Sequence, residues 1–298
     1  MILGQNQYGK AENRVVRVVR DGATHHIKDL SVSVSLSGDM EDVHLSGSNA
    51  NVLTTDTTKN TVFAFAKEHG IASAEQFGIH LARHFVTSQE SIRSARIRIE
   101  EYAWERIGVP GPQQHSFVRT NQETRTAQIT FDGGAWQIVS GLKDLVVLNS
   151  TDSEFHGYVK DRYTTLPETR DRVLATQVHA RWRHAWTGDA APEPPGDWDR
   201  SYRQAREHLL AAFAGTYSLS LQQTLYQMGS RVIDHCPGID EIRLSLPNKH
   251  HFLADLTPFG LKNDNEVYYA ADRPYGLIEA TILRDGAEPG IPVDMTNL

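Results

Sequence analysis

The strongest constraint on the fold is an order of secondary-structure patterns that occurs twice along the 298-residue chain. In the first half, alternating apolar residues predict a strand over residues 15–20 and a returning strand over 27–36, joined by the Asp21–Gly22 turn. Helical spacing then predicts two helices, which begin near Asp56 and Ser73. Further strand patterns follow over residues 92–104, 113–120 and 124–131.

The second half of the chain repeats this order. Strand patterns and helical stretches are expected over residues 142–148, 173–186, 200–214, 220–233, 241–246, 267–270 and 276–283. The duplication predicts an α+β fold with two similar halves around antiparallel sheets, and we place them at residues 1–138 and 139–298. Antiparallel sheets leave open edges, and oligomerisation is one way to cover them.

The composition argues against several classes of protein. A formal net charge of −7 disfavours binding to a phosphate backbone, so nucleic acid is not an expected partner. Cys236 is the only cysteine, which excludes an intramolecular disulfide and a multi-cysteine zinc site. No apolar run approaches the roughly 18 residues of a membrane helix, and the N-terminal segment lacks the features of a signal peptide. We therefore expect a cytoplasmic protein with no membrane partner.

Residues 245–252 form the most informative segment, because a strand pattern ends there in polar side chains. Pro247 cannot donate to a sheet ladder, so the strand is expected to end or become an edge at that point. Asn248 and His250 are two residues apart and point to one side of an extended chain. An amide beside an imidazole suits a site that holds a polar ligand and moves protons. A solvated polar loop is the alternative.

Two groups in the first half admit a functional and a structural interpretation. Lys10 precedes the first predicted strand, where a lone lysine is usually a surface residue. Thr55 and Asp56 lie in a polar run at the start of the first predicted helix. Such residues cap helices, but the same geometry leaves backbone N–H groups facing an anion.

Three groups in the second half admit the same two interpretations. Arg172 either pairs with Glu168 or Asp171 on the surface or grips a planar polar ligand with its fork of donors. Phe155 is either a core aromatic or a platform on which a ring stacks. Gln222, at the start of the last predicted helix, offers a donor and an acceptor that match a lactam edge.

Motifs for a bound metal or nucleotide are missing from the sequence. His80 and His84 have the spacing of a metal pair, but no Glu follows His80, so a half-buried helix face explains them better. The chain contains no P-loop, no Gly-x-Gly-x-x-Gly and no Gly-x-Ser-x-Gly. We expect no cofactor.

Taken together, these segments resemble the urate oxidase (uricase) family. The segments that carry the resemblance are residues 8–10, 55–56, 59–61, 141–145, 150–155, 163–166, 171–172, Gln222 with Tyr226, and residues 245–252. The family has a tunnelling fold, in which each chain holds two tandem α+β halves and four chains stack into a barrel with a central tunnel. The resemblance therefore implies a homotetramer whose active sites are shared between subunits.

The resemblance also implies which residues bind the substrate. Arg172 resembles the arginine that grips one edge of urate, and Gln222 resembles the glutamine that reads the opposite edge. Phe155 matches the phenylalanine that stacks on the purine, and Leu166 matches an apolar wall. Leu221 lies where the family makes a main-chain contact, often from valine, so the change of side chain is expected to matter little.

The remaining matches imply the chemistry. Thr55 and Asp56 resemble the pair that a neighbouring subunit supplies, and Asn248 resembles the residue that holds oxygen or water above the ring. Lys10, Thr55 and His250 resemble a proton-relay triad. The implied reaction is oxidation of urate by O2 and water to 5-hydroxyisourate and H2O2. A zinc-dependent pterin enzyme of the same fold and a non-catalytic purine-binding protein remain alternatives.

Overall fold

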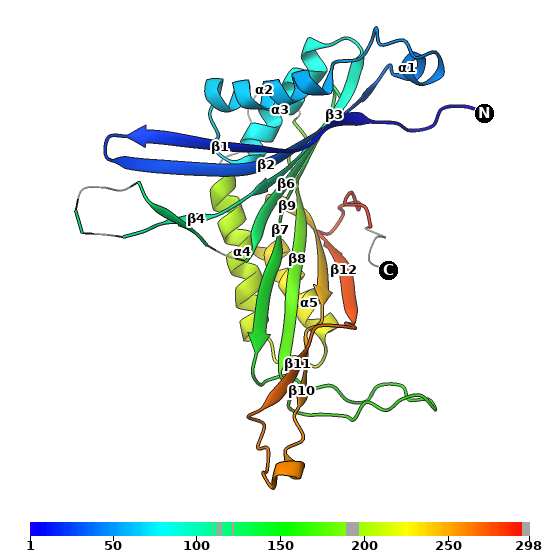
Figure 1. Ribbon diagram of the computed structural model, residues 1–298. Coiled ribbons are helices and arrows are strands. Elements are labelled where there is room, and N and C mark those ends of the chain that lie inside the picture. Colours follow the sequence, from blue (N-terminus) through cyan, green and yellow to red (C-terminus); the bar gives the residue numbers. More distant parts are fainter. Residues whose placement is uncertain (109, 112–114, 121, 189–196, 294–298) are drawn as a thin grey trace. The chain divides into compact units, whose positions relative to one another are not determined.

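The computed structural model describes the chain except for residues 109, 112–114, 121, 189–196 and 294–298 (Figure 1). The chain forms two compact units. The first holds Met1–Gly141 and Arg183–Tyr202, and the second holds Leu142–Trp182 and Arg203–Leu298. Each unit combines antiparallel strands with helices, which confirms the predicted α+β fold. The division between residues 138 and 139 stays a prediction.

The first unit contains a long hairpin, two long helices and the strands that follow them. Its elements are β1 (Tyr8–Asp21), β2 (Thr24–Gly38), α1 (Glu41–Leu45), α2 (Thr55–Glu68), α3 (Ala74–Ser88), β3 (Ile92–Glu101), β4 (Trp104–Arg106), β5 (Phe117–Arg119) and β6 (Thr124–Phe131). The strands β1, β2, β3 and β6 pair in this order, each antiparallel to the next. Figure 1 shows α2 and α3 together on one side of these strands.

The core of the first unit follows from two periodicities in the sequence. Alternate residues of β2, from Leu30 to Leu36, are buried because successive strand side chains point to opposite faces. In α3, Phe77, Leu81 and Phe85 recur every four residues and are almost fully buried on the face that packs against β3 and β6. The helix begins at the expected place because the Ser73 side chain accepts a 3.1 Å hydrogen bond from the Gln76 N–H.

The second unit has the same order of elements. The strands β7 (Trp136–Asn149) and β8 (Leu174–His184) and the helix α4 (Trp198–Gly215) contribute most of their length to it. They are followed by α5 (Leu221–His235), β9 (Ile239–Pro247), β10 (His250–Leu253), η1 (Thr257–Phe259), β11 (Tyr268–Ala271) and β12 (Leu277–Leu283). The sheet order is β7-β8-β9-β12, and α5 packs on β9 and β12.

Both units carry a two-stranded ribbon at the same point of this order. The β4–β5 ribbon lies in sequence between β3 and β6, and the β10–β11 ribbon lies between β9 and β12. Each unit also has a glycine where its second helix meets the sheet. A Cβ on Gly78 would lie 2.5 Å from Ile129 Cδ1, and one on Gly229 would lie 2.5 Å from Ile282 Cδ1. The duplication therefore extends from element order to helix–sheet packing.

One predicted strand limit is wrong. The strand β1 begins at Tyr8 rather than Val15, so Lys10 lies within it rather than before it. Its first part contains a β-bulge, in which Ala11 and Glu12 lie opposite the single residue Ser33, and this extra residue breaks the alternation. The expected end of a strand at Pro247 is confirmed, because β9 ends there and a new strand, β10, begins at His250. Part of the strand predicted over residues 113–120 lies outside the described residues, and its described part contains β5.

The first unit encloses a cluster of polar side chains, which we call the buried polar cluster: Glu75, Arg125, Ser140 and His184. Arg125 Nη2 lies 2.6 Å from Glu75 Oε2, and Ser140 Oγ donates to Glu75 Oε1 at 2.6 Å. Ser140 Oγ also lies 2.9 Å from His184 Nε2. Burial would lower the pKa of Arg125, but Glu75, Glu101 and Asp199 together raise it. Arg125 is therefore held in its charged form.

Candidate functional site

In the first unit the structure brings Lys10 near the start of α2. The helix packs against β1, and the Lys10 charge is one of the influences on the Asp56 carboxylate. The pKa of Asp56 is lowered mainly by its hydrogen bond and charge interaction with Lys59, and to a smaller degree by Lys10. Lys10, Thr55 and Asp56, predicted from separate segments, thus form one group.

The start of α2 presents backbone donors to the outside of the helix. The Thr54 side chain accepts a 3.1 Å hydrogen bond from the Thr57 N–H, and the Thr54 carbonyl accepts one from Thr58. The first N–H groups of a helix have no acceptor within the helix. The cap therefore leaves the N–H groups of Thr55 and Asp56 for another acceptor, and the positive end of the helix dipole favours an anion there.

In the second unit Arg172 and Phe155 form a charged and aromatic surface. The Arg172 guanidinium carbon lies 5.2 Å from the centre of the Phe155 ring, and Arg172 Nε donates to Ser153 Oγ at 3.1 Å. Phe155 also stacks on Tyr158, with ring centres 4.9 Å apart. Burial lowers the pKa of Arg172 from its ordinary value. The surface alternative for Arg172 is wrong, because its partners are Ser153 and Phe155 rather than Glu168 or Asp171.

The segment that carries Phe155 is tied to the start of α5. Ser153 and Ser218 form a β-bridge, and the Glu154 N–H donates to the Ser218 carbonyl at 2.8 Å. Ser220 caps the helix by accepting from the Gln223 N–H at 3.1 Å. The next residue, Leu221, has a buried side chain, whereas Gln222 is exposed. The main chain at Leu221 and the side-chain amide of Gln222 are thus attached to a fixed backbone.

Asn248 and His250 lie where β9 gives way to β10. The Asn248 N–H donates to the Gly276 carbonyl at 2.8 Å, and the Lys249 N–H donates to the Ala175 carbonyl at the same distance. Burial lowers the pKa of His250, and the charges of Arg172 and His251 lower it further. His250 is therefore neutral near pH 7 and lies within electrostatic range of Arg172.

The structure brings together Lys10, Thr55 and Asp56 in the first unit and Arg172, Phe155 and His250 in the second. In the second unit, Arg172 and Phe155 are in contact, and Arg172 acts on the pKa of His250. Leu166 is 51% exposed in the segment between β7 and β8. The Tyr158 hydroxyl donates to the Leu166 carbonyl, which folds this segment back on itself.

Two supporting residues were not singled out from the sequence. Ser153 orients the Arg172 side chain, and Tyr158 supports the Phe155 ring. Both belong to the run Ser-Glu-Phe-His-Gly-Tyr that surrounds Phe155. Its alternation of small polar and aromatic residues was the available signal, but their pairing depends on a loop whose path the sequence does not show.

Comparison with known proteins identifies the family. The family model described as Uricase matches residues 6–130 and 138–279. The uricase of Arthrobacter globiformis is 51% identical over 293 residues, which cover 98% of this chain and 93% of that protein. The uricase of Oryctolagus cuniculus is 36% identical over 93% of each chain. The chain belongs to the uricase family.

Solved uricase structures agree with this assignment. The crystal structure of the Arthrobacter globiformis uricase matches with a TM-score of 0.92, covering 98% of both chains at 51% identity. The uricase of Bacillus fastidious, at 22% identity, shares the fold with a TM-score of 0.79 over 95% of this chain and 94% of that chain. As a member of the uricase family, the chain is a urate oxidase of purine degradation. Within the described residues no helix is long and apolar enough to span a membrane.

Proposed function

We propose that the two groups of residues form one urate site, with the first-unit group supplied by a neighbouring subunit of a cytoplasmic homotetramer. The observation that carries the proposal is the grouping of Arg172, Phe155 and His250 in the second unit. It combines a cationic fork, an aromatic face and a neutral imidazole. The Lys10, Thr55 and Asp56 group adds backbone N–H donors and an amine.

Arg172 and Gln222 fix the orientation of urate. Because the Arg172 Nε donates to Ser153, its two terminal nitrogens are directed to other acceptors, and a planar lactam edge offers two. Gln222 reads the opposite edge with one donor and one acceptor. Phe155 stacks on the purine ring, Leu166 forms an apolar wall, and the Leu221 main chain adds a hydrogen bond. This positioning lowers the barrier by holding urate in its reactive orientation.

The reaction needs no cofactor in this proposal, because electron-rich urate itself supplies the electrons. Two electrons pass from urate to O2, and a water oxygen bonds to the ring carbon to give 5-hydroxyisourate. The two protons released by urate and water complete H2O2. Asn248 holds O2 or water above the ring, while Lys10, Thr55 and His250 move the protons. His250 is able to accept one because its lowered pKa leaves it neutral.

A mixture of two impaired variants, assayed at urate concentrations far below the wild-type KM, tests whether the site is shared. Chains with Lys10→Met lack the relay, and chains with Arg172→Ala lack the urate fork. If one site takes Lys10 from one chain and Arg172 from another, co-expressed variants regain about a quarter of the wild-type sites by random pairing in a symmetric assembly. A chain with both substitutions, mixed with either single variant, is the matched control and shows no more activity than the single variants. Absence of recovery in the first mixture would contradict a shared site.

A chelator experiment tests the cofactor-free chemistry separately. Loss of urate absorbance and production of H2O2 are followed together, with and without a strong chelator. We expect equal rates in both conditions and one H2O2 per urate consumed. A rate that falls with the chelator and returns with an added metal ion would overturn this part of the proposal.

A further inference from the structure

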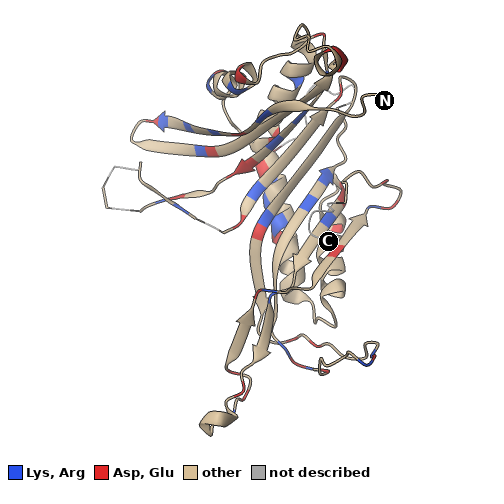
Figure 2. Cartoon of the chain, turned by 45° about the vertical axis from the view of Figure 1, so that its right-hand side comes forward, with Lys and Arg blue, Asp and Glu red and all other residues tan. Residues whose placement is uncertain are grey.

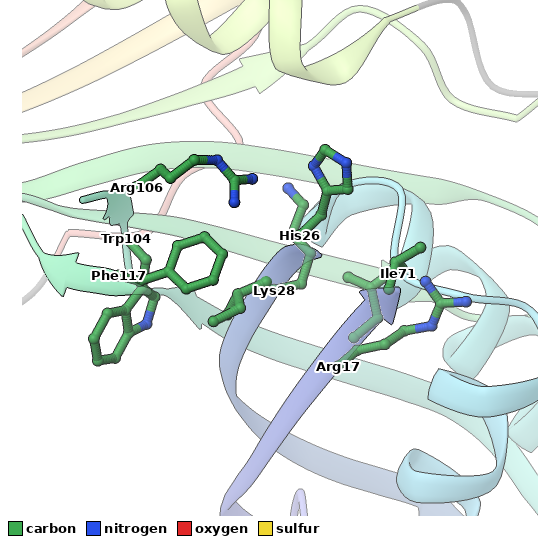
Figure 3. Close-up of a pocket in the computed structure, with 9 residues that line it drawn as sticks. Arg17, His26, Lys28, Ile71, Trp104, Arg106 and Phe117 are labelled. Carbon is green, nitrogen blue, oxygen red and sulfur yellow. The ribbon is translucent and has the colours of Figure 1, made fainter. Parts of the chain in front are cut away.

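The first unit contains a pocket that the urate site does not use. It has a volume of about 400 Å³, within the usual range for small-molecule sites (Figure 3). Its walls come from the outer part of the β1–β2 hairpin, the connection between α2 and α3, and the β4–β5 ribbon. The lining residues are Arg17, Val19, His26, Ile27, Lys28, Ile71, Trp104, Arg106 and Phe117. We call it the hairpin pocket.

The hairpin pocket occupies the same place in the element order as the urate-binding group of the second unit. Ile71 precedes α3 as Ser218 precedes α5, and Trp104 begins the ribbon after β3 as His250 begins the ribbon after β9. The remaining lining residues come from the β1–β2 hairpin of the first unit. Arg172 comes from the corresponding segment of the second unit, between β7 and β8. The duplication has therefore placed the hairpin pocket and the second-unit group at corresponding points of the element order.

Cationic side chains dominate the lining of the hairpin pocket. Arg17 and Lys28 lie opposite each other on β1 and β2 and so share one face of the hairpin, and Arg106 faces them from β4. Lys28 is offset by Glu101, at 2.6 Å, and more weakly by Asp199. No acidic side chain belongs to the lining. The pocket therefore favours an anion.

Arg17 is the cation with the greatest freedom to meet a ligand. No described carboxylate lies within ion-pair distance of its guanidinium. Its outer end lies beside Gly70, which has a positive φ of 75°, and a Cβ at that position would come within 3.5 Å of the Arg17 guanidinium carbon. In Figure 3 the Arg17 side chain and Ile71 lie at one end of the group, with Phe117 and Trp104 at the other.

Aromatic rings complete the hairpin pocket. The Arg106 guanidinium carbon lies 4.9 Å from the centre of the Phe117 ring, and these two residues are opposite each other in the ribbon. The Trp104 indole N–H donates to Asp29 Oδ2 at 3.0 Å, so its ring is held in place. A stacked Arg and an aromatic ring together recognise flat, negatively charged molecules.

We propose that the hairpin pocket is a second binding site for a small aromatic anion, the chemical class to which urate belongs. Its cations neutralise the ligand charge, with Arg17 as the direct partner, and Phe117 with the Arg106 plane provides the stacking surface. The site is separate from the oxidation site, and the expected count of two sites per chain rests on the urate site proposed above. The lining includes Lys28 and His26 but no hydroxyl side chain, so it does not reproduce the Lys10, Thr55 and His250 relay, and the hairpin pocket holds its ligand without reaction.

Anaerobic equilibrium dialysis with urate tests the proposal, since without O2 urate binds but is not consumed. We expect two urate molecules per wild-type chain, one per Arg17→Gln chain and one per Arg172→Ala chain. Arg20→Gln is the matched control, because Arg20 is an exposed arginine of the same strand outside the pocket, and it should still bind two. The turnover number of Arg17→Gln should equal that of the wild type.

Two results would overturn the inference. One is a wild-type chain that binds a single urate molecule, with that binding abolished only by Arg172→Ala. The other is an Arg17→Gln chain that still binds two urate molecules. Phe117→Leu provides a second variant in case Arg17→Gln unfolds, and it should weaken the second binding event at least about fivefold by removing the stacking surface. Competition with sulfate at constant ionic strength distinguishes recognition of the ligand's charge from recognition of its shape. If sulfate displaced both bound urate molecules equally, an aromatic ligand class would be contradicted.

Discussion

The two units share one order of elements but place their polar side chains differently. The first unit encloses the buried polar cluster, with Glu75 fully buried and Arg125 charged beside it. The second unit also buries charged groups, but with different partners: Glu241 accepts from the backbone N–H groups of Gly290 and Ile291, and Arg243 pairs with Glu279 at 3.2 Å. Its Arg172 and Phe155 form a separate group in the segment between β7 and β8. The two halves of the duplicated fold therefore hold different charged groups in their interiors.

The largest expected effects are kinetic, and substitutions in the two units should change different parameters, kcat or KM. Lys10→Met in the first unit should lower kcat by roughly 10²–10⁴-fold, because it removes a proton carrier, and should alter KM less. Arg172→Ala in the second unit should raise KM at least about tenfold, since losing a hydrogen bond to a charged group costs about 1.5–3 kcal/mol. Steady-state kinetics with urate measures both. Wild-type turnover in Lys10→Met would remove it from the relay.

Breaking the buried polar cluster should have the largest effect on stability. Glu75→Ala removes the fully buried carboxylate that lies 2.6 Å from Arg125 Nη2, and such a change typically costs about 3–5 kcal/mol. Thr224→Val in the second unit removes only a neutral hydrogen bond and should cost about 1 kcal/mol. Urea unfolding at one protein concentration compares the two. Equal losses would show that the Glu75–Arg125 ion pair contributes no more than a neutral hydrogen bond.

The pH dependence of stability should reveal His184. Burial, and then the Arg125 charge, lower the pKa of His184 to about 3, whereas a histidine in the unfolded chain has its ordinary value near 6.5. Between these values the unfolded chain binds a proton that the folded chain does not, so stability is complete above about pH 6.5 and falls as the pH falls. His184→Asn should flatten this slope by about 1.4 kcal/mol per pH unit. An unchanged slope between pH 6 and 4 would contradict the pKa.

The smallest expected effects concern the two helix caps, which should respond alike. Thr54→Ala at α2 and Ser220→Ala at α5 each remove a side chain that accepts a 3.1 Å hydrogen bond from the helix, at a cost of about 1 kcal/mol. Thermal unfolding measures both losses. Since both caps lie beside proposed substrate contacts, KM for urate should rise in both variants. A rise in only one would show that a single helix start contacts urate.

The sequence predicts the repeat well because its signals are local. Caps such as Ser73 and Ser220 and the four-residue spacing of Phe77, Leu81 and Phe85 mark helices without knowledge of the rest of the chain. Proposed roles for the site residues came from the family resemblance, whereas the contact of Arg172 with Phe155 depends on how the segment between β7 and β8 folds.

Other features have no local signal. Glu75 and Arg125 are 50 positions apart in the sequence, and each alone is typical of a solvated surface. The hairpin pocket draws its lining from β1, β2, the connection between α2 and α3, and the β4–β5 ribbon, so no single sequence motif predicts it. The start of β1 was missed because the bulge between Lys10 and Asn13 interrupts the period of two.

The number of residues in that bulge determines which face of the sheet Lys10 occupies. Lys10 lies opposite Val34 and Asn13 lies opposite Val32, so both point to the same face although an odd number of positions separates them. Removing Ala11 or Glu12 would leave a regular ladder with Lys10 still on this face. A register shift by one residue, without a deletion, would instead place the Lys10 side chain on the opposite face of the sheet. The bulge therefore makes this part of β1 tolerant of a one-residue deletion but not of a register shift.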